Sequence, residues 1–257
     1  MEIGSFIELE LPDSGEFYSQ NTGIARLNSG RSGIYHALRR LKCNKIYLPF
    51  YLCPSVEEFL KRKEISILKY YISENFEPLL QDTESESAIL IVNYFGIMAK
   101  ERMLKITGKF HNVIIDNCPG FFSEPIPDCF NIYSARKFFG VPDGGYVIGP
   151  DAELGINDYQ QDESSDTSAF LLKRIEKGSS PVYAERMRNE ERIDNSDISR
   201  MSLLTLKLLK SIDYKLVKKR RSINFQYAHN LFKSYNRLDT EKFSDSNCFP
   251  MAYPLYV

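Results

Sequence analysis

The chain has 257 residues, of which 43% are hydrophobic, and a formal net charge of −1. It is long enough for one large domain or for one domain and part of another. Its charge balance argues against an overall attraction to nucleic acid or membrane. No apolar run reaches the ~20 residues that span a bilayer. The acidic N-terminus is unlike a signal peptide, and five scattered cysteines form no CxxC pair, so we expect a cytoplasmic protein with reduced thiols and no metal site.

The first candidate site is a glycine- and serine-containing loop. We expect residues 1–27 to form an opening strand and a polar loop, followed by LNSGRSG at 27–33 and a helix whose apolar positions 34, 37, 38 and 41 share one face. A loop that opens a helix presents free N–H groups and the positive end of the helix dipole, which suit a phosphate. Gly30, Arg31 and Ser32 are therefore candidate phosphate-binding residues, although an ordinary helix N-cap is the alternative.

Short apolar segments then alternate with helices. We expect strands over 45–48, 65–71, 88–92 and 112–116, with helices over 55–63 and up to about 108. Continuous apolar runs such as 88–92 are typical of strands buried on both faces of a parallel sheet. The alternation predicts an α/β fold, in which ligands bind at the carboxyl ends of the strands. Tyr51, Asn93, Asp116 and Lys137 are all expected at or just beyond such ends.

A lysine lies between two predicted strands. Lys137 follows an apolar and aromatic run and precedes VPDGG at 141–145, after which a strand is expected over 146–148. Lysine is strongly hydrated, so a lysine between buried strands usually serves a chemical purpose, and the alternative is a surface hairpin. Asp116 closes a buried strand, where a carboxylate either caps the next loop or pairs with a buried cation.

The remaining third of the chain is more polar. We expect a flexible surface loop over 151–168, helices over 169–177 and 181–193, and a long amphipathic helix or helix pair over 199–235. The basic run 218–221 predicts a solvated helix face rather than a DNA-binding arm, because the overall charge is balanced. Residues 249–257 are expected to begin a further strand.

Taken in order, the loop at 30–32, the strand ending in Asp116 and the lysine before two glycines resemble the fold-type-I pyridoxal-phosphate enzymes. The likeness is to the DegT/DnrJ sugar aminotransferases and covers roughly residues 25–235. It implies a three-layer α/β/α large domain with a mostly parallel mixed sheet over 1–198. Residues 199–257 would then hold a long helical segment and the start of a small C-terminal domain that is largely missing.

The resemblance also assigns roles to individual residues. The loop at Gly30, Arg31 and Ser32 would hold the phosphate of pyridoxal 5'-phosphate, Asp116 its pyridine nitrogen, and Lys137 the cofactor itself as a Schiff base. Ser134, three residues before the lysine, resembles the phosphate-binding serine of a Ser-x-x-Lys motif. Tyr51 is the expected aromatic partner of the ring, with Phe50 as the alternative.

The implied activity is transfer of an amino group from an amino-acid donor to a keto acceptor. The best candidate for the acceptor is a nucleotide-linked sugar used for surface polysaccharide. The resemblance also implies a homodimer whose sites lie near the subunit boundary. Three positions depart from the sugar aminotransferase pattern: Ile132 replaces a serine, Pro119 replaces a histidine or glutamine, and Ile198 replaces an asparagine that reaches the partner subunit. The alternative function is a non-catalytic relative that keeps the fold and the dimer interface.

Overall fold

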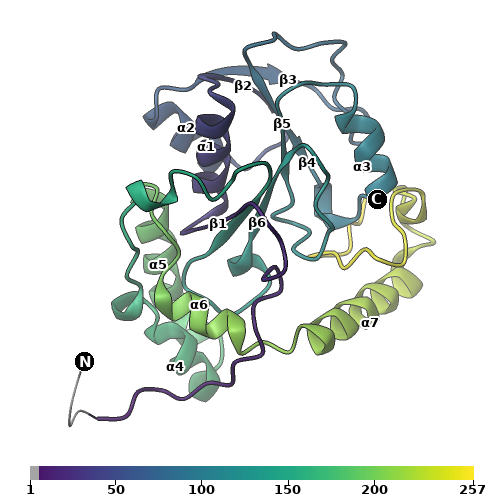
Figure 1. The fold of residues 1–257 in the computed structure, drawn as a ribbon. Coiled ribbons are helices and arrows are strands. Elements are labelled where there is room, and N and C mark those ends of the chain that lie inside the picture. The colour runs from purple at the N-terminus through teal and green to yellow at the C-terminus, as the bar shows by residue number, and fades with distance from the viewer. Residues whose placement is uncertain (1–5) are drawn as a thin grey trace.

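The protein is described from a computed structural model that defines residues 6–257. Within these residues, seven strands form one sheet in the order β1-β7-β6-β5-β4-β2-β3 (Figure 1). Neighbouring strands are parallel except at the two pairings of β7, with β1 and with β6, which are antiparallel. The strands are β1 (Ile24–Leu27), β2 (Lys45–Pro49), β3 (Ser66–Tyr70), β4 (Ala88–Val92), β5 (Val113–Asp116), β6 (Phe130–Ser134) and β7 (Gly145–Ile148).

The central strands are apolar throughout because both faces of the sheet are covered. On β4, Ala88 and Leu90 belong to one core cluster, whereas Ile89 and Ile91 belong to another. This alternation follows from the two-residue period of a strand, which points successive side chains to opposite faces. The prediction of buried parallel strands over 88–92 and 112–116 is confirmed.

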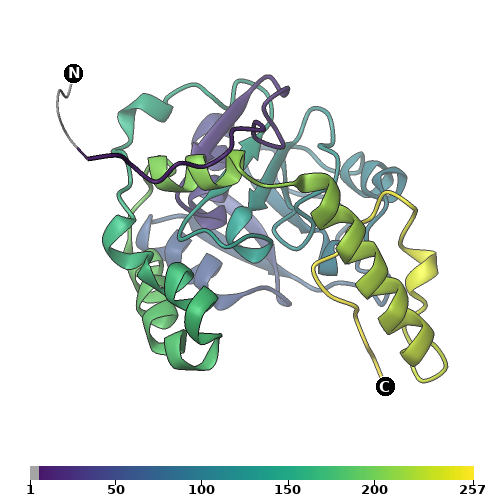
Figure 2. The same cartoon turned by 90° about the horizontal axis from the view of Figure 1, so that it is seen from below.

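Helices form the two outer layers. The helices are α1 (Gly30–Leu41), α2 (Pro54–Arg62), α3 (Lys100–Thr107), α4 (Ala169–Lys177), α5 (Tyr183–Asn195), α6 (Leu203–Lys210) and α7 (Tyr214–Phe232). Leu38 of α1 and Phe59 of α2 pack on one face of the sheet, while Met103 of α3 packs on the other. Leu209 of α6 joins an aromatic cluster with Tyr133 on that second face, and α7 runs along the same side (Figure 2). The result is the predicted three-layer α/β/α arrangement.

Several sequence-based boundaries are confirmed. The helix expected over 169–177 is α4, and the helical region expected over 199–235 is the pair α6 and α7. Helix α1 begins at Gly30, earlier than the expected start after Gly33, because the Ser29 side chain accepts a hydrogen bond from the Ser32 N–H and so acts as an ordinary N-cap. No helix within residues 6–257 combines the length and apolar character needed to cross a membrane.

The predicted opening strand is wrong for the residues that the structure describes, and residues 1–5 lie outside them. Residues 6–11 are irregular, with Phe6 and Ile7 largely exposed, and the first strand is β1 at Ile24–Leu27. A strand needs a neighbouring strand to pair its backbone groups. β1 has β7, whereas no pairing in the sheet includes residues 6–11.

The strand expected at 249–257 is also wrong. This segment has no strand pairing, and its backbone is held by loops instead: Met251 N–H donates to the carbonyls of Phe95 and Pro119, at 3.2 Å each. Arg237 N–H donates to the Tyr256 carbonyl at 2.7 Å. Alternating apolar residues are therefore not sufficient for a strand where no sheet edge is available.

The structure adds detail to two further expectations. The stretch 151–168 is a loop with two short 3₁₀ turns, and the side chains of Ala152, Tyr159 and Ser164 anchor it because they are buried. The basic run in α7 is only partly solvated. Lys218 Nζ lies 4.8 Å from the centre of the Phe17 ring, and the Arg221 guanidinium lies 4.1 Å from that of Phe138.

Candidate active site

The sheet topology brings three of the predicted site segments to one edge. Leu27, at the end of β1, pairs with Gly145, and Gly145 pairs with Ser134, at the end of β6. Because β1 and β6 are both antiparallel to β7, their carboxyl ends lie at the same edge of the sheet. The loop that opens α1 and the 3₁₀ turn Ala135–Lys137 therefore start side by side.

Asp116 lies at the end of β5, next to β6 in the sheet. It pairs with Val92 on β4 and with Ile132 on β6, and it is 7% exposed. Its Oδ1 accepts a hydrogen bond from the Cys118 N–H at 2.9 Å. One oxygen of the Asp116 carboxylate thus caps the loop, which is the first of the two roles that the sequence left open. The cap uses only this oxygen, so the negative charge of the carboxylate can still act on a cation in the site.

Lys137 occupies an exposed position at this edge, beside Asp116. Enough protein surrounds its amine for desolvation to lower the pKa of Lys137. The pKa of Lys137 is nevertheless raised overall, because the nearby acidic groups raise it by more than burial lowers it. These groups are Cys118, Asp116 and Cys53. Lys137, Asp116 and Cys118 therefore form one group, in which Asp116 is the charged partner of Lys137 near neutral pH because the Cys118 thiol is protonated there. Burial raises the pKa of the Cys118 thiol well above its usual range, with Asp116 as a further cause, so this thiol stays protonated near neutral pH.

Gly30 connects the α1 loop to this group. A Cβ on Gly30 would lie 2.6 Å from Cys118 Sγ and 3.9 Å from the Cβ of Ser134. Any side chain at position 30 would therefore collide with Cys118, whose N–H donates to Asp116. The close approach also places Ser134, which is 7% exposed, beside the N-terminus of α1.

The side chains of the α1 loop are engaged within the protein. Ser32 Oγ donates to Asn28 Oδ1 at 2.7 Å, and Arg31 Nη1 lies 2.5 Å from Asp194 Oδ1 on α5. The N–H groups of Gly30 and Arg31 have no acceptor among residues 6–257, as expected for the first turn of a helix. The loop therefore offers backbone N–H groups to an anion, while the Arg31 guanidinium points to α5.

Tyr51 lies beyond the end of β2, and its ring is 59% exposed. It stacks on Tyr94 with ring centres 5.4 Å apart and an interplanar angle of 11°, and the Tyr94 hydroxyl donates to the Tyr51 carbonyl at 2.9 Å. Burial raises the pKa of Tyr94, and the Asp116 carboxylate raises it further. Phe50, the alternative aromatic residue, stacks on Tyr71 instead.

Tyr51 also lines a cavity of about 730 Å³. The cavity is bounded by the segments 74–76, 237–243 and 254–256 and includes Arg237 and Lys242. Lys137 and Asp116 are not among its lining residues. The cavity is therefore adjacent to the lysine site and separate from it.

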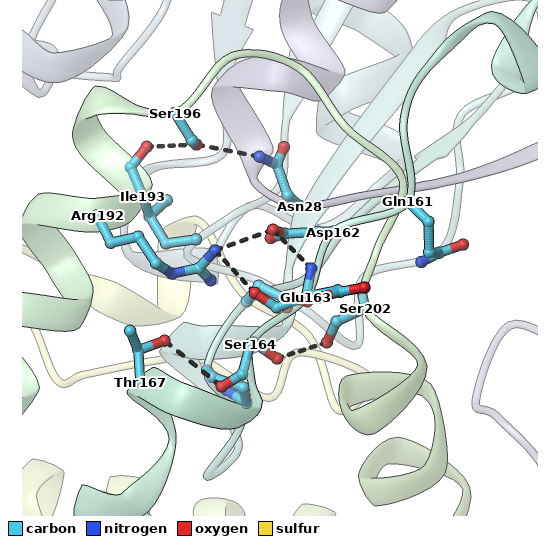
Figure 3. Close-up of polar contacts among 12 residues, drawn as sticks. Asn28, Gln161, Asp162, Glu163, Ser164, Thr167, Arg192, Ile193, Ser196 and Ser202 are labelled. Carbon is cyan, nitrogen blue, oxygen red and sulfur yellow. Dashed lines mark hydrogen bonds and ion pairs between the residues drawn. The ribbon is translucent and has the colours of Figure 1, made fainter.

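The turn after Lys137 is anchored by a hydrogen bond from the start of α6 to Asp143. Asp143 is fully buried, and its Oδ1 accepts from the N–H of Ser202, the N-cap of α6, at 3.3 Å. Burial raises the pKa of Asp143, although its bonds to Ser202 and Thr205 oppose this. Ser202 Oγ in turn lies 2.7 Å from Ser164 Oγ (Figure 3). The loop that was expected to be flexible thus supports the lysine turn.

The site fits a pyridoxal-type cofactor in its donor set. Such a group needs an amine for its aldehyde, a carboxylate for its ring nitrogen, and N–H donors for its phosphate. Lys137, Asp116 and the N-terminus of α1 supply these three, and the narrow approach at Gly30 brings them within one site. No group of three or more His, Cys, Asp or Glu side chains within residues 6–257 is arranged to hold a metal ion.

Four residues of this site were missed by sequence reasoning. Cys53 and Cys118 raise the pKa of Lys137, Tyr94 stacks on Tyr51, and Asn28 accepts a hydrogen bond from the Ser32 hydroxyl. Cys118 stands two residues beyond the predicted strand 112–116. The rule that ligands gather at strand ends, extended to the next two residues, would have found it. Asn28 follows a strand, β1, that was expected to be a loop at this point.

Neither a protein-family model nor a curated protein matches this sequence. Solved structures do match its fold. NtdA from Bacillus subtilis, with bound cofactor PMP, has a TM-score of 0.55 at 13% identity, covering 84% of this chain and 50% of that one. A DegT DnrJ EryC1 StrS aminotransferase from Brucella abortus has a TM-score of 0.53 at 14% identity, covering 91% and 65%. DesV from S. venezuelae, in complex with a ketimine intermediate, has a TM-score of 0.50 at 15% identity, covering 91% and 63%.

These likenesses confirm the predicted fold. The chain has the α/β architecture of the aminotransferases to which its sequence motifs are similar, and it spans less than two thirds of the length of each of these three structures. At such identities the comparison shows the fold alone, and function has to be argued from the site.

Proposed function

We propose that this protein is a pyridoxal-phosphate-dependent aminotransferase with Lys137 as its catalytic lysine. The observation that carries the proposal is the convergence of Lys137, Asp116 and the N-terminus of α1 at one edge of the sheet, joined through Cys118. The fold shared with the Brucella abortus aminotransferase and with DesV supports the same class.

In this proposal each residue has a defined task. Lys137 binds the cofactor covalently and moves a proton at the substrate carbon once its amine is released. The bound cofactor supplies an electron sink for that carbon. Asp116 keeps the ring nitrogen protonated, and the N–H groups of Gly30 and Arg31, with the hydroxyl of Ser134, hold the phosphate. Ser32 keeps the loop in shape through Asn28.

The substrates are proposed from likeness. The donor is an amino acid, and the acceptor is a small keto compound, for which a nucleotide-linked sugar used in surface polysaccharide is the best candidate. The enzyme would act in the cytoplasm as a homodimer. Tyr51 would face the cofactor ring with the side that Tyr94 leaves free.

The second candidate function is a non-catalytic relative with the same fold. It is favoured by one observation: Arg31 and Ser32, expected to bind phosphate, are both engaged within the protein. A relative of this kind would keep the sheet and the dimer interface without loading the cofactor at Lys137.

Covalent labelling separates the two candidates. Purified protein is incubated with pyridoxal phosphate, reduced with borohydride and mapped by peptide mass spectrometry. We expect the adduct on Lys137, and we expect Lys137→Arg, which keeps the cation and removes the primary amine, to carry none. Lys219→Ala, at an exposed position on α7, is the control and should label like the unaltered protein. An adduct spread over other lysines, or none at all, would favour the non-catalytic relative.

A further inference from the structure

Helix α5 contacts the lysine turn on both sides of Lys137. Arg136, directly before the lysine, donates from Nη2 to Glu190 Oε2 at 2.5 Å. Pro142, five residues after it, accepts a hydrogen bond through its carbonyl from Asn189 Nδ2 at 2.7 Å. Asn189 and Glu190 are consecutive on α5, and Asn189 is 1% exposed. One short segment of helix therefore fixes both ends of the turn that carries the lysine.

The C-terminal end of the same helix holds the α1 loop. Asp194, four residues after Glu190 and so on the same face of α5, pairs with Arg31. Just beyond the helix, Ser196 Oγ accepts a hydrogen bond from Asn28 Nδ2 at 3.1 Å (Figure 3). The Asp197 carbonyl accepts a second one from the same amide at 2.9 Å. The loop and the lysine turn thus share a single support.

The two arginine side chains that pair with α5 are largely shielded from water. The side chains of Arg31 and Arg136 are only 8% and 19% exposed, and the one acidic partner that each has among residues 6–257 lies on α5. Arg31 Nε and Arg136 Nη1 are buried with no acceptor in that part of the chain. A buried guanidinium that loses its carboxylate is left uncompensated, so each pair is costly to break.

We propose that α5 sets the position of Lys137 relative to the α1 loop, and that Glu190 and Asn189 are positioning residues for the lysine turn. Neither residue is assigned a contact with substrate or cofactor. The consequence for amino transfer rests on the proposed function, whereas the effect on the turn itself does not depend on it.

Hydrogen–deuterium exchange on the full chain without added cofactor tests the structural part. The reporting amides are those of Ala135, bonded to the Gly144 carbonyl at 3.0 Å, and Phe138, bonded to the Ala135 carbonyl at 3.0 Å. In Glu190→Gln we expect exchange in the peptides covering 134–146 to be about tenfold faster, since losing one charged hydrogen bond shifts a local opening equilibrium by roughly that factor. Exchange in β4 and β5 should stay unchanged.

A matched control lies on the same helix. Glu185 pairs with Lys173 of α4 at 2.7 Å and has a side chain 27% exposed, against 28% for Glu190. Glu185→Gln removes an equivalent carboxylate away from the lysine turn and should leave 134–146 unchanged. Equal exchange in Glu190→Gln and Glu185→Gln, or a rise spread evenly over the sheet, would overturn the proposal.

The pH profile of Lys137 gives a second readout that a general loss of stability would not move. The Arg136 cation lowers the pKa of Lys137, and Glu190 offsets that cation. Competitive acetylation of Lys137, followed by mass spectrometry, should therefore show its reactivity rising at lower pH in Glu190→Gln than in the unaltered protein. Glu190→Asp, which restores the charge, should move the profile back. An unmoved profile would contradict a positioning role.

The two proposals fail differently. If pyridoxal phosphate labels no lysine in any variant, the proposed function is wrong while the exchange and acetylation results still decide the role of α5. If Lys137 is labelled equally in Glu190→Gln and the unaltered protein and exchange at 134–146 is unchanged, the proposed function stands and α5 has no positioning role.

Discussion

Asp116 performs two tasks that one substitution can separate. Its Oδ1 caps the loop through the Cys118 N–H, and its negative charge acts on Lys137 and Tyr94. An asparagine keeps an oxygen for the cap and removes the charge. The sequence left open whether Asp116 caps a loop or pairs with a cation. Asp116→Asn separates these roles, because it should impair the second and spare the first.

We predict that Asp116→Asn abolishes or strongly weakens amino transfer while the fold remains. In the proposed function Asp116 pairs with the protonated ring nitrogen of the cofactor. Loss of one member of a buried charge pair costs about 3–5 kcal/mol, so the half-reaction with an amino-acid donor should slow strongly. Single-turnover spectroscopy measures the rate, and circular dichroism checks the fold. Near-normal rates would show that Asp116 serves the loop only.

His36 is a buried residue whose protonation state is set by its neighbours. Nε2 lies 2.7 Å from the Ala152 carbonyl and must donate to it, so in the neutral ring Nδ1 accepts from the Tyr159 hydroxyl at 2.9 Å. That hydroxyl accepts from Arg39 Nη1 at 3.2 Å. Burial lowers the pKa of His36 and outweighs the carbonyl bond that raises it. The residue therefore belongs to the core and has no link to the site.

Because the folded protein holds His36 neutral, protonation favours the unfolded state. The contribution to stability is fully present above the unfolded pKa of about 6.5 and is lost as the pH falls below it, by up to about 1.4 kcal/mol per pH unit for one proton. We expect the urea midpoint to fall between pH 7.5 and 5.5, and to fall less in His36→Gln. An identical pH slope in both proteins would mean that His36 is not the group responsible.

At the scale of elements, the site depends on how closely β7 approaches the start of α1. A Cβ on Gly145 would lie 2.6 Å from both the carbonyl carbon and the oxygen of Ser29. Gly144, beside it, has φ +118°, which side chains rarely adopt. The two glycines after Asp143 are thus required for different reasons, one for space and one for backbone conformation.

Gly145→Ala should therefore push the α1 loop away from the lysine turn. Overpacking of this kind costs about 1–3 kcal/mol, measurable as a lower urea midpoint, and should weaken pyridoxal phosphate binding in parallel. Gly140→Ala is the control, because a Cβ there meets only Leu171 at 3.7 Å and its φ is not positive. If both variants behave alike, the close approach has no role in the site.

At the scale of the whole molecule, large apolar side chains remain on the surface. Leu172 and Ile175 of α4 are 63% and 82% exposed, and Phe6 and Ile7 of the N-terminal segment are more exposed still. Tyr227 and Tyr235, in and after α7, are also exposed, at 68% and 71%. Clusters of exposed apolar side chains usually mark an interaction surface.

We predict that the protein is a homodimer. Two-fold dimers are the commonest symmetric assembly, and burial of these side chains would supply the driving force. Sedimentation velocity or light scattering over a dilution series should show a mass twice that of one chain. A stable monomer at micromolar concentration would contradict the prediction.

The sequence by itself determined the layer order and the positions of the central residues. Strands such as β4 and helices such as α4 follow from local periodicity. Lys137 and Asp116 were found because a charged residue at the end of an apolar run stands out without any knowledge of its neighbours.

Only the tertiary structure decided what the polar side chains contact. Arg31 was expected at a phosphate and pairs with Asp194, 163 positions later in the chain, and Arg136 pairs with Glu190. The segment 6–11 has strand-like residues and no strand, because it lacks a neighbour with which to pair. Long-range pairing depends on which segments become neighbours after folding, and local periodicity carries no information about that.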